Sequence, residues 1–265
     1  MIATVSHMTA IEDFADALSE LLNEAADVFL EDLPGSLITS SDSPWARDRA
    51  AWTASFDSDD VAGWVSETSA IYLAEAARLL RGHATLLQTR SVFATIDVIV
   101  RAIIERVGHA NWILDHQISA RQRSARAGLE LAVCFYMYRE NLHLLDASQP
   151  HRRAVRAEAR LQQRQLKEWF AVVQPPEDEC DDDSPPTGDV RRWIVDSESF
   201  PTLTQAATFA MERGGIVGNV ARGVYASLSG FSHPNVVFSR EHRDIDELGH
   251  ITFRYERPEM ENAEL

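Results

Sequence analysis

The chain has 265 residues, of which 41 are acidic and 25 basic, so its formal net charge at neutral pH is −16. A protein of this charge repels nucleic acid and anionic membranes unless its basic residues are locally concentrated, so neither duplex DNA nor a membrane is expected as a partner. The two cysteines, Cys134 and Cys180, form no Cys-x-x-Cys pair, and the amino-terminal residues lack the basic and apolar regions of a secretion signal. These features predict a soluble protein of the reducing cytoplasm.

Apolar residues recur at helical spacing along most of the chain. Thr9 and Glu12 form a capping box that begins a helix, and the helical pattern continues to about Leu30. Residues 31–57 are rich in Pro, Gly, Ser and Asp, and they are predicted to form a loop that packs onto the rest of the protein. Four further helices are predicted, with Gly82 as a break between the first two: 59–80, 83–116, 119–145 and 150–173.

A strongly acidic segment follows these helices. Six of the seven residues from Glu177 to Asp183 are acidic, and a segment of this composition cannot bury enough apolar area to order itself. Residues 175–189 are therefore predicted to be a flexible linker. After it the sequence predicts two helices and, from alternating β-branched and aromatic residues, two strands of a hairpin: 202–212, 216–231, 236–238 and 251–255.

Together these elements predict an all-α protein, an antiparallel bundle of about six or seven helices with a small C-terminal β-hairpin. Residues 1–174 are expected to form the main bundle with a loop insertion at 31–57, and residues 190–265 to complete it. Exposed apolar helical faces of this kind commonly pair, so a homo-oligomer is expected.

Polar residues interrupt the most apolar helix at regular intervals. Asp97, Arg101, Glu105 and His109 follow one another every four residues, so they lie along one slowly drifting face of the helix. Buried charges must be paired, which makes a structural ion-pair ladder one interpretation. In the other, the ladder faces a cleft, and Glu105 or His109 titrates near neutral pH as an acid or base.

A second polar series lies in the last predicted helix. Tyr225, Ser229 and His233 are again four residues apart, among small residues that allow close approach, and Pro234 ends the helix. The helix dipole favours a histidine in the last turn, and a serine can bond to the carbonyl four residues earlier, so both residues also have a purely structural explanation.

These two helices resemble a bacterial family of unknown function that is placed near the HEPN helical superfamily. The resemblance rests on Arg101 and Glu105 in an apolar helix and on the later Tyr-x3-Ser-x3-His-Pro motif, and it extends loosely over residues 85–234. Members of that superfamily include ribonuclease toxins, abortive-infection proteins and nucleotide-binding bundles. The resemblance implies a role in bacterial stress or defence and a cleft where polar residues from separate helices bind a nucleotide or RNA.

The resemblance also implies roles for individual residues in that cleft. Glu105 and His233 would be the catalytic acid–base groups if the protein is a nuclease, and no cofactor would be needed. The ligand-binding residues would be Arg101 as the fixed positive charge together with Tyr225, Ser229, Asp97 and His109.

An alternative is a di-iron-like bundle enzyme that acts on a small molecule. Glu140 and His143 have the Glu-x-x-His spacing of such centres, and Glu105 and His109 are possible partners on the neighbouring helix. Ferritin-like centres use two such pairs and two further glutamates, whereas the predicted helices contain one pair.

The helix predicted at 150–173 carries a basic stripe. Arg152, Arg156, Arg160 and Arg164 follow at four-residue intervals, and residues 119–167 have a net charge of +6, which leaves −22 for the rest of the chain. The stripe could bind the phosphates of a nucleic acid or nucleotide. The acidic segment that follows is expected to compete for it, since it is tethered at high effective concentration.

Overall fold

The computed structural model describes residues 2–32, 44–56, 60–89, 96–144, 148–174, 189–232, 243–245 and 251–253. Within these ranges it contains eight α-helices, and its few strands are two or three residues long. The predicted all-α class with a small C-terminal hairpin is confirmed. No helix in these ranges is long and apolar enough to span a membrane.

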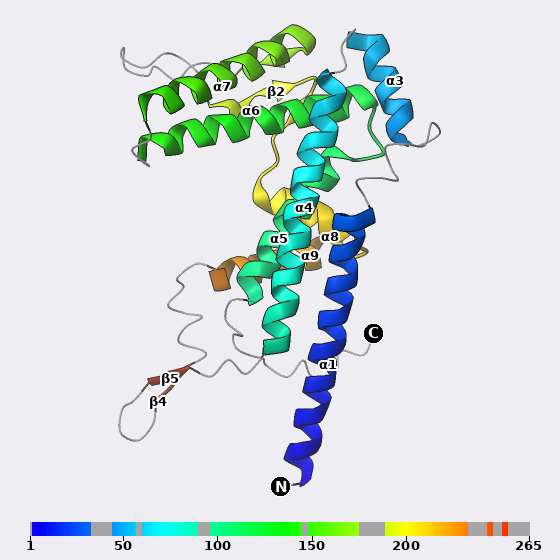
Figure 1. Ribbon diagram of the computed structural model, residues 1–265, viewed down its shortest axis with the longest axis vertical. Helices are drawn as coiled ribbons and strands as arrows, with labels where there is room; N and C mark the ends of the chain where they lie inside the picture. The colour runs from blue at the N-terminus through cyan, green and yellow to red at the C-terminus, as the bar shows by residue number, and fades with distance from the viewer. Residues whose placement is uncertain are drawn as a thin grey trace.

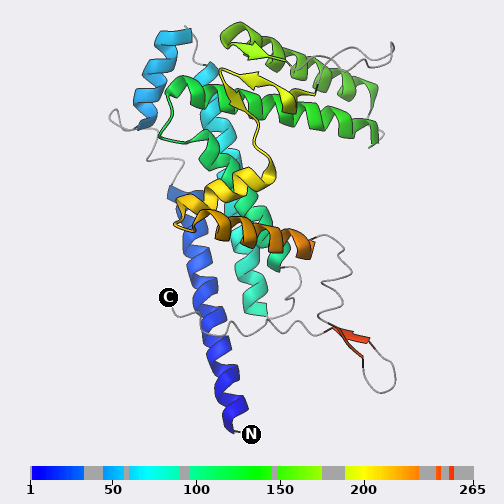
Figure 2. The same cartoon turned by 180° about the vertical axis from the view of Figure 1, so that it is seen from behind.

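The long helices are arranged in two groups (Figure 1). Helices α1 (Ile2–Asp27), α4 (Asp60–Thr89) and α5 (Ile96–Ile113) lie side by side and alternate in direction. Helices α6 (Ala120–Leu144) and α7 (Gln149–Trp169) form an antiparallel pair across one end of this group. Seen from behind, the two shorter helices α8 (Leu203–Arg213) and α9 (Gly218–Ser232) cross α5 (Figure 2).

Local sequence signals set the start of two helices. The side chain of Thr202 accepts a hydrogen bond from the backbone N–H of Gln205, and the Gln205 side chain accepts one from the backbone N–H of Thr202. This reciprocal capping box begins α8 at a predicted position. Pro150 lies in the first turn of α7, where its missing N–H has no helical partner to lose.

The prediction of a loop over residues 31–57 is wrong in part. A π-helical turn, Val28–Asp32, extends α1, and Pro44–Phe56 forms helix α3. Trp52 of α3 is buried, and its indole N–H donates a hydrogen bond to the carbonyl of Ala120 over 2.7 Å. This contact with a distant part of the chain stabilises a helix that the local composition does not predict.

The predicted break at Gly82 is also wrong. Helix α4 continues to Thr89, and α5 begins at Ile96 rather than at His83. A glycine in a helix costs only about 1 kcal/mol, and here the next turn is held by packing, since His83 and Ala84 are buried and Ser19 Oγ donates to the Ala84 carbonyl over 3.2 Å. Helix α1 begins at Ile2, earlier than the predicted capping box.

A small antiparallel sheet was not predicted. It has the order β1 (Val172–Val173), β2 (Ile194–Val195) and β3 (Glu198–Ser199), and α7 therefore ends at Trp169 instead of continuing to Val173. Strands of two residues are too short to show alternation in a sequence.

The turn between β2 and β3 is fixed by its own residues and by α6. Asp196 and Ser197 have φ values of 47° and 70°, which suit a tight hairpin turn. The Asp196 carboxylate accepts a hydrogen bond from the Ala171 N–H over 2.8 Å and pairs with Arg121 of α6 over 2.5 Å. The sheet is thereby tied to α6.

Strands β4 (Arg243–Ile245) and β5 (Ile251–Phe253) pair antiparallel and form the C-terminal hairpin. Strand β5 lies within the second predicted strand, 251–255. Strand β4 lies at 243–245, a position for which no strand was predicted. The strand predicted at 236–238 and most of the linker predicted at 175–189 lie outside the described residues.

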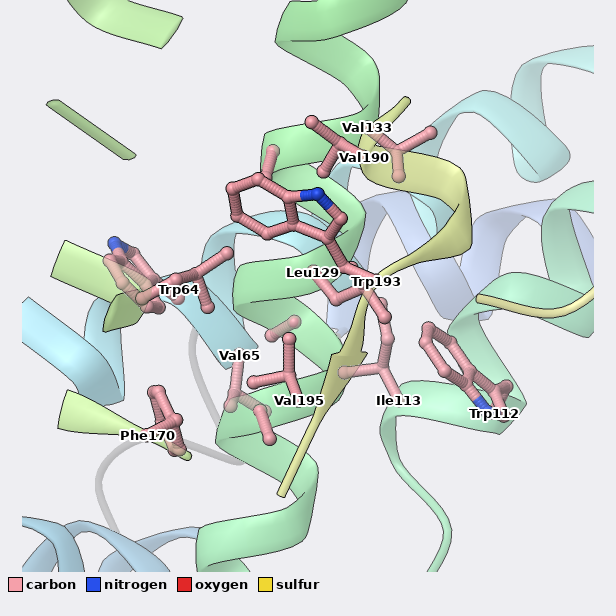
Figure 3. Packing of buried hydrophobic residues seen from close by; sticks show 14 of the residues in the cluster. Trp64, Val65, Trp112, Ile113, Leu129, Val133, Phe170, Val190, Trp193 and Val195 are labelled. Atoms are coloured by element: carbon pink, nitrogen blue, oxygen red, sulfur yellow. The ribbon is translucent and has the colours of Figure 1, made fainter. Parts of the chain in front are cut away.

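The main hydrophobic core lies where α4, α5 and α6 meet the small sheet and the end of α7 (Figure 3). Trp193, directly before β2, and Val195 of β2 contribute buried side chains, and Trp193 lies beside Leu129 of α6. The other labelled members of this cluster are Trp64, Val65, Trp112, Ile113, Phe170 and Val190.

Candidate functional site

Three of the residues singled out in the sequence meet between α5 and α9. Arg101 Nε donates a hydrogen bond to Glu105 Oε1 over 2.7 Å, and the Tyr225 hydroxyl donates to the same oxygen, also over 2.7 Å. The Arg101 guanidinium lies over the Tyr225 ring, 5.7 Å from its centroid. We call Arg101, Glu105 and Tyr225 the α5–α9 cluster.

The α5–α9 cluster is largely shielded from water. The side chains of Arg101 and Glu105 are 15% and 18% exposed, and Tyr225 belongs to a buried group with Ala207, Met211 and Ala221. Burial lowers the pKa of Arg101, but hydrogen bonding with Glu105 and Tyr225 outweighs it, so the pKa is raised and the guanidinium stays charged. Burial, followed by the hydrogen bond to Glu105, raises the pKa of Tyr225 to about 12.

The raised pKa of Tyr225 predicts a pH dependence of stability. Its folded-state pKa exceeds the unfolded value of about 10, so the stabilisation is complete below pH 10 and is lost as the pH rises towards 12. By about pH 11.5 the wild type should lose about 2 kcal/mol more unfolding free energy than Tyr225→Phe, which has no phenol to titrate. Urea unfolding of both proteins at pH 9 and pH 11.5 measures this difference, and parallel losses would contradict it.

The other predicted ligand residues are placed differently. Asp97 is half-buried in the first turn of α5, where a carboxylate is favoured by the helix dipole, and no hydrogen bond or ion pair within the described ranges joins it to Arg101. Ser229 is half-buried one turn beyond Tyr225 on α9. His233 directly follows α9 but lies outside the described residues.

His109 faces a different set of partners from Glu105. It is buried, and its Nδ1 lies 2.8 Å from Oε2 of Glu130 on α6. The Glu130 side chain is only 1% exposed, and its other oxygen, Oε1, accepts a short hydrogen bond from the Tyr72 hydroxyl of α4. The His109 ring stacks on Tyr72 and contacts Phe200, with ring centroids 5.4 and 5.5 Å apart.

Cys134 lies at the outer edge of this group. Its Sγ lies 3.8 Å from Glu130 Oε1 and 4.0 Å from the Tyr72 hydroxyl. Exclusion of water by the surrounding protein, together with the Glu130 carboxylate, raises the pKa of this thiol to about 12. The same two causes raise the pKa of Tyr72. Both groups therefore stay protonated at neutral pH and can donate to Glu130.

The group of His109, Glu130, Tyr72 and Cys134 was missed in the sequence because its members come from three helices. One signal was present: Glu130 is the only charged residue in the otherwise apolar run from Gly128 to Val133. A charge in an apolar helix needs a partner, so Glu130 is a candidate on the same grounds as Asp97.

The residues of the metal-site alternative do not lie together where they can be placed. Glu105 is turned to Tyr225, and His109 to Glu130. Glu140 pairs with its neighbour Arg139 over 2.8 Å, and the side chain of His143 lies outside the described set. Among the described residues, no group of three or more His, Cys, Asp or Glu side chains could hold a metal ion.

Comparison with known proteins identified no relative of this chain. No family model, no curated protein and no solved structure matches the chain.

Proposed function

We propose that this chain is a HEPN-like bacterial protein of stress or defence that binds an anionic ligand, a nucleotide or RNA, at the α5–α9 cluster. The observation that supports this proposal is the convergence of Arg101, Glu105 and Tyr225 from two helices that are distant in sequence. Glu105 and the Tyr225 ring hold the guanidinium in one orientation, and a preorganised guanidinium binds phosphate oxygens in bidentate fashion.

Each residue has a role in this proposal. Arg101 is the fixed positive charge, Glu105 orients it, and Tyr225 and Ser229 are neutral hydrogen-bonding groups on one side of α9. Because Glu105 cancels the charge of Arg101, an anion needs a second cation. His233 follows Ser229 by four residues, and its protonated imidazole would supply that charge.

The second cation makes binding dependent on pH. We expect the affinity for a short fluorescein-labelled single-stranded RNA to rise roughly tenfold between pH 8 and pH 5.5, because one charge-assisted contact contributes about 1.5 kcal/mol. A phosphodiester keeps its charge over this range, so the change reports on the protein. Fluorescence anisotropy measures it, and His233→Gln should bind with an affinity that does not change with pH. A pH-dependent affinity that survives in His233→Gln would contradict the assignment.

The resemblance extends this proposal to RNA cleavage, with Glu105 and His233 as the acid–base pair. Gel analysis of the same RNA after incubation with the wild type and with Glu105→Gln tests this extension. Cleavage that is equal in both proteins would rule out Glu105 as a catalytic group.

A homo-oligomer in the cytoplasm is also part of the proposal. On α1 and the turn that extends it, Phe14, Leu21 and Val28 are 65%, 60% and 51% exposed. Their seven-residue spacing is typical of a seam between paired helices. Light scattering from the purified protein should give a multiple of the chain mass, and the mass of one chain would contradict the proposal.

A further inference from the structure

Helix α7 presents a row of cations to solvent that the α5–α9 cluster does not involve. Five residues of α7 are exposed and basic, and we call them the basic face of α7: Arg153, Arg156, Arg160, Arg164 and Lys167. At 3.6 residues per turn these positions fall within an arc of about 80°. They extend over about 21 Å of helix axis and are spaced by about 4.5–6 Å along it.

The basic face is carried on a well-anchored helix. The opposite side of α7 is buried through Val155, Ala159 and Leu166. Lys167 lies over the ring of Trp193, 5.1 Å from its centroid, which fixes the C-terminal end of the row beside the small sheet. The row is therefore straight and rigid, so little conformational entropy is lost from the backbone when a ligand binds.

For three of the five cations in this row, no carboxylate within the described ranges neutralises the charge. Arg153, Arg160 and Arg164 form no ion pair with a carboxylate there. The two acidic residues of α7, Glu158 and Glu168, fall outside the arc, and Glu158 accepts a hydrogen bond from Gln162. The local charge is thus strongly positive although the molecule as a whole is acidic.

The composition of the face indicates the kind of ligand. Its arc contains no exposed aromatic or large aliphatic side chain, so it lacks the apolar groups by which amphipathic helices enter membranes and by which protein partners are anchored. Evenly spaced arginines instead match a ligand with repeated phosphates, since each guanidinium can bind two phosphate oxygens. A flexible single strand can follow one row, whereas a rigid duplex would bring its second strand close to the acidic remainder of the protein.

We propose that the basic face of α7 binds the phosphodiester backbone of a single-stranded nucleic acid. Recognition is through the backbone and does not depend on sequence. The interaction is local and strongly dependent on salt, because the net charge of −16 gives no long-range attraction. This surface is separate from the α5–α9 cluster, so either could be lost without the other.

The test compares two charge-matched triple variants by anisotropy with labelled oligo-U and oligo-dT. Arg153→Gln/Arg160→Gln/Arg164→Gln removes three cations from the face. Its control removes three exposed arginines elsewhere: Arg47→Gln/Arg78→Gln/Arg222→Gln. All six positions are exposed, so both variants should unfold at the wild-type temperature.

Each phosphate contact to a single strand contributes about 0.7 to the slope of log affinity against log salt. The wild-type slope should be about −3.5. The slope of the α7 triple variant should be about −1.5, and this variant should bind at least tenfold more weakly at low salt. The control triple should keep the wild-type slope. Similar affinities for oligo-U and oligo-dT would support recognition of the backbone.

Several results would overturn the proposal. Equal weakening in both triple variants would show that only the overall charge matters. Tighter binding to a duplex or to poly-glutamate than to the single strands would assign the face to a different ligand. A wild-type slope near zero would show that no phosphates are bound.

Discussion

Replacing Glu130 with alanine is expected to destabilise the protein by about 3–5 kcal/mol, because it leaves the buried His109 and the half-buried Tyr72 without their acceptor. His109 and Tyr72 each direct a polar atom at one oxygen of Glu130, and the Cys134 thiol lies beside it. These residues come from α4, α5 and α6, so the loss acts where the main core is assembled.

Urea unfolding monitored by circular dichroism measures this effect. Glu140→Ala is the matched control, since Glu140 lies on the same helix, is 53% exposed on its side chain and pairs with its neighbour Arg139. It should change the unfolding free energy by less than about 1 kcal/mol. If Glu130→Ala does not fold, Glu130→Gln keeps two hydrogen-bonding atoms and should be intermediate. A loss below about 1 kcal/mol in Glu130→Ala would contradict the account.

Replacing Gly108 with alanine is expected to destabilise the protein by about 3 kcal/mol. A Cβ at this position would lie 2.6 Å from the carbonyl carbon of Ala206 and closer still to its oxygen. These are backbone atoms of α8 and cannot move without separating α8 from α5. The glycine is thus what allows the two helices to approach closely.

Gly82→Ala is the control for this variant, and it should have the opposite sign. A Cβ at Gly82 meets nothing within 4 Å, and alanine is the better helix former by about 1 kcal/mol. Thermal unfolding should therefore show a raised midpoint for Gly82→Ala and a lowered one for Gly108→Ala. Equal effects of both would show that α5 and α8 are not in close contact.

The helices could be predicted where apolar periodicity was long, because burial of one helical face leaves that pattern in the sequence. Helix α3 and the three-stranded sheet could not, since both are stabilised by distant contacts such as that of Trp52 with Ala120 and of Arg121 with Asp196. Gly82 shows the converse: a local helix-breaking signal was overridden by packing of the following turn.

The polar residues of α5 were partly predictable for a similar reason. Spacing alone indicated that Arg101 and Glu105 pair along the helix. The spacing could not indicate that other helices pack against several sides of α5. Glu105 therefore contacts Tyr225 of α9, whereas His109, one turn later, contacts Glu130 of α6. The direction in which a polar side chain of a buried helix points is decided by its neighbours, which a single sequence does not specify.

Binding of the anionic ligand by Arg101 can be tested by comparing two arginines of α5. Arg106 is the matched control, because it is also paired with a carboxylate, Glu75, over 2.8 Å. Isothermal titration calorimetry with ATP and with short single-stranded RNA at pH 6 measures binding to the wild type, Arg101→Gln and Arg106→Gln. We expect Arg101→Gln to lose at least tenfold in affinity, whereas Arg106→Gln should stay within twofold of the wild type. Equal affinities of the two variants for both ligands, with Arg101→Gln still folded, would contradict it.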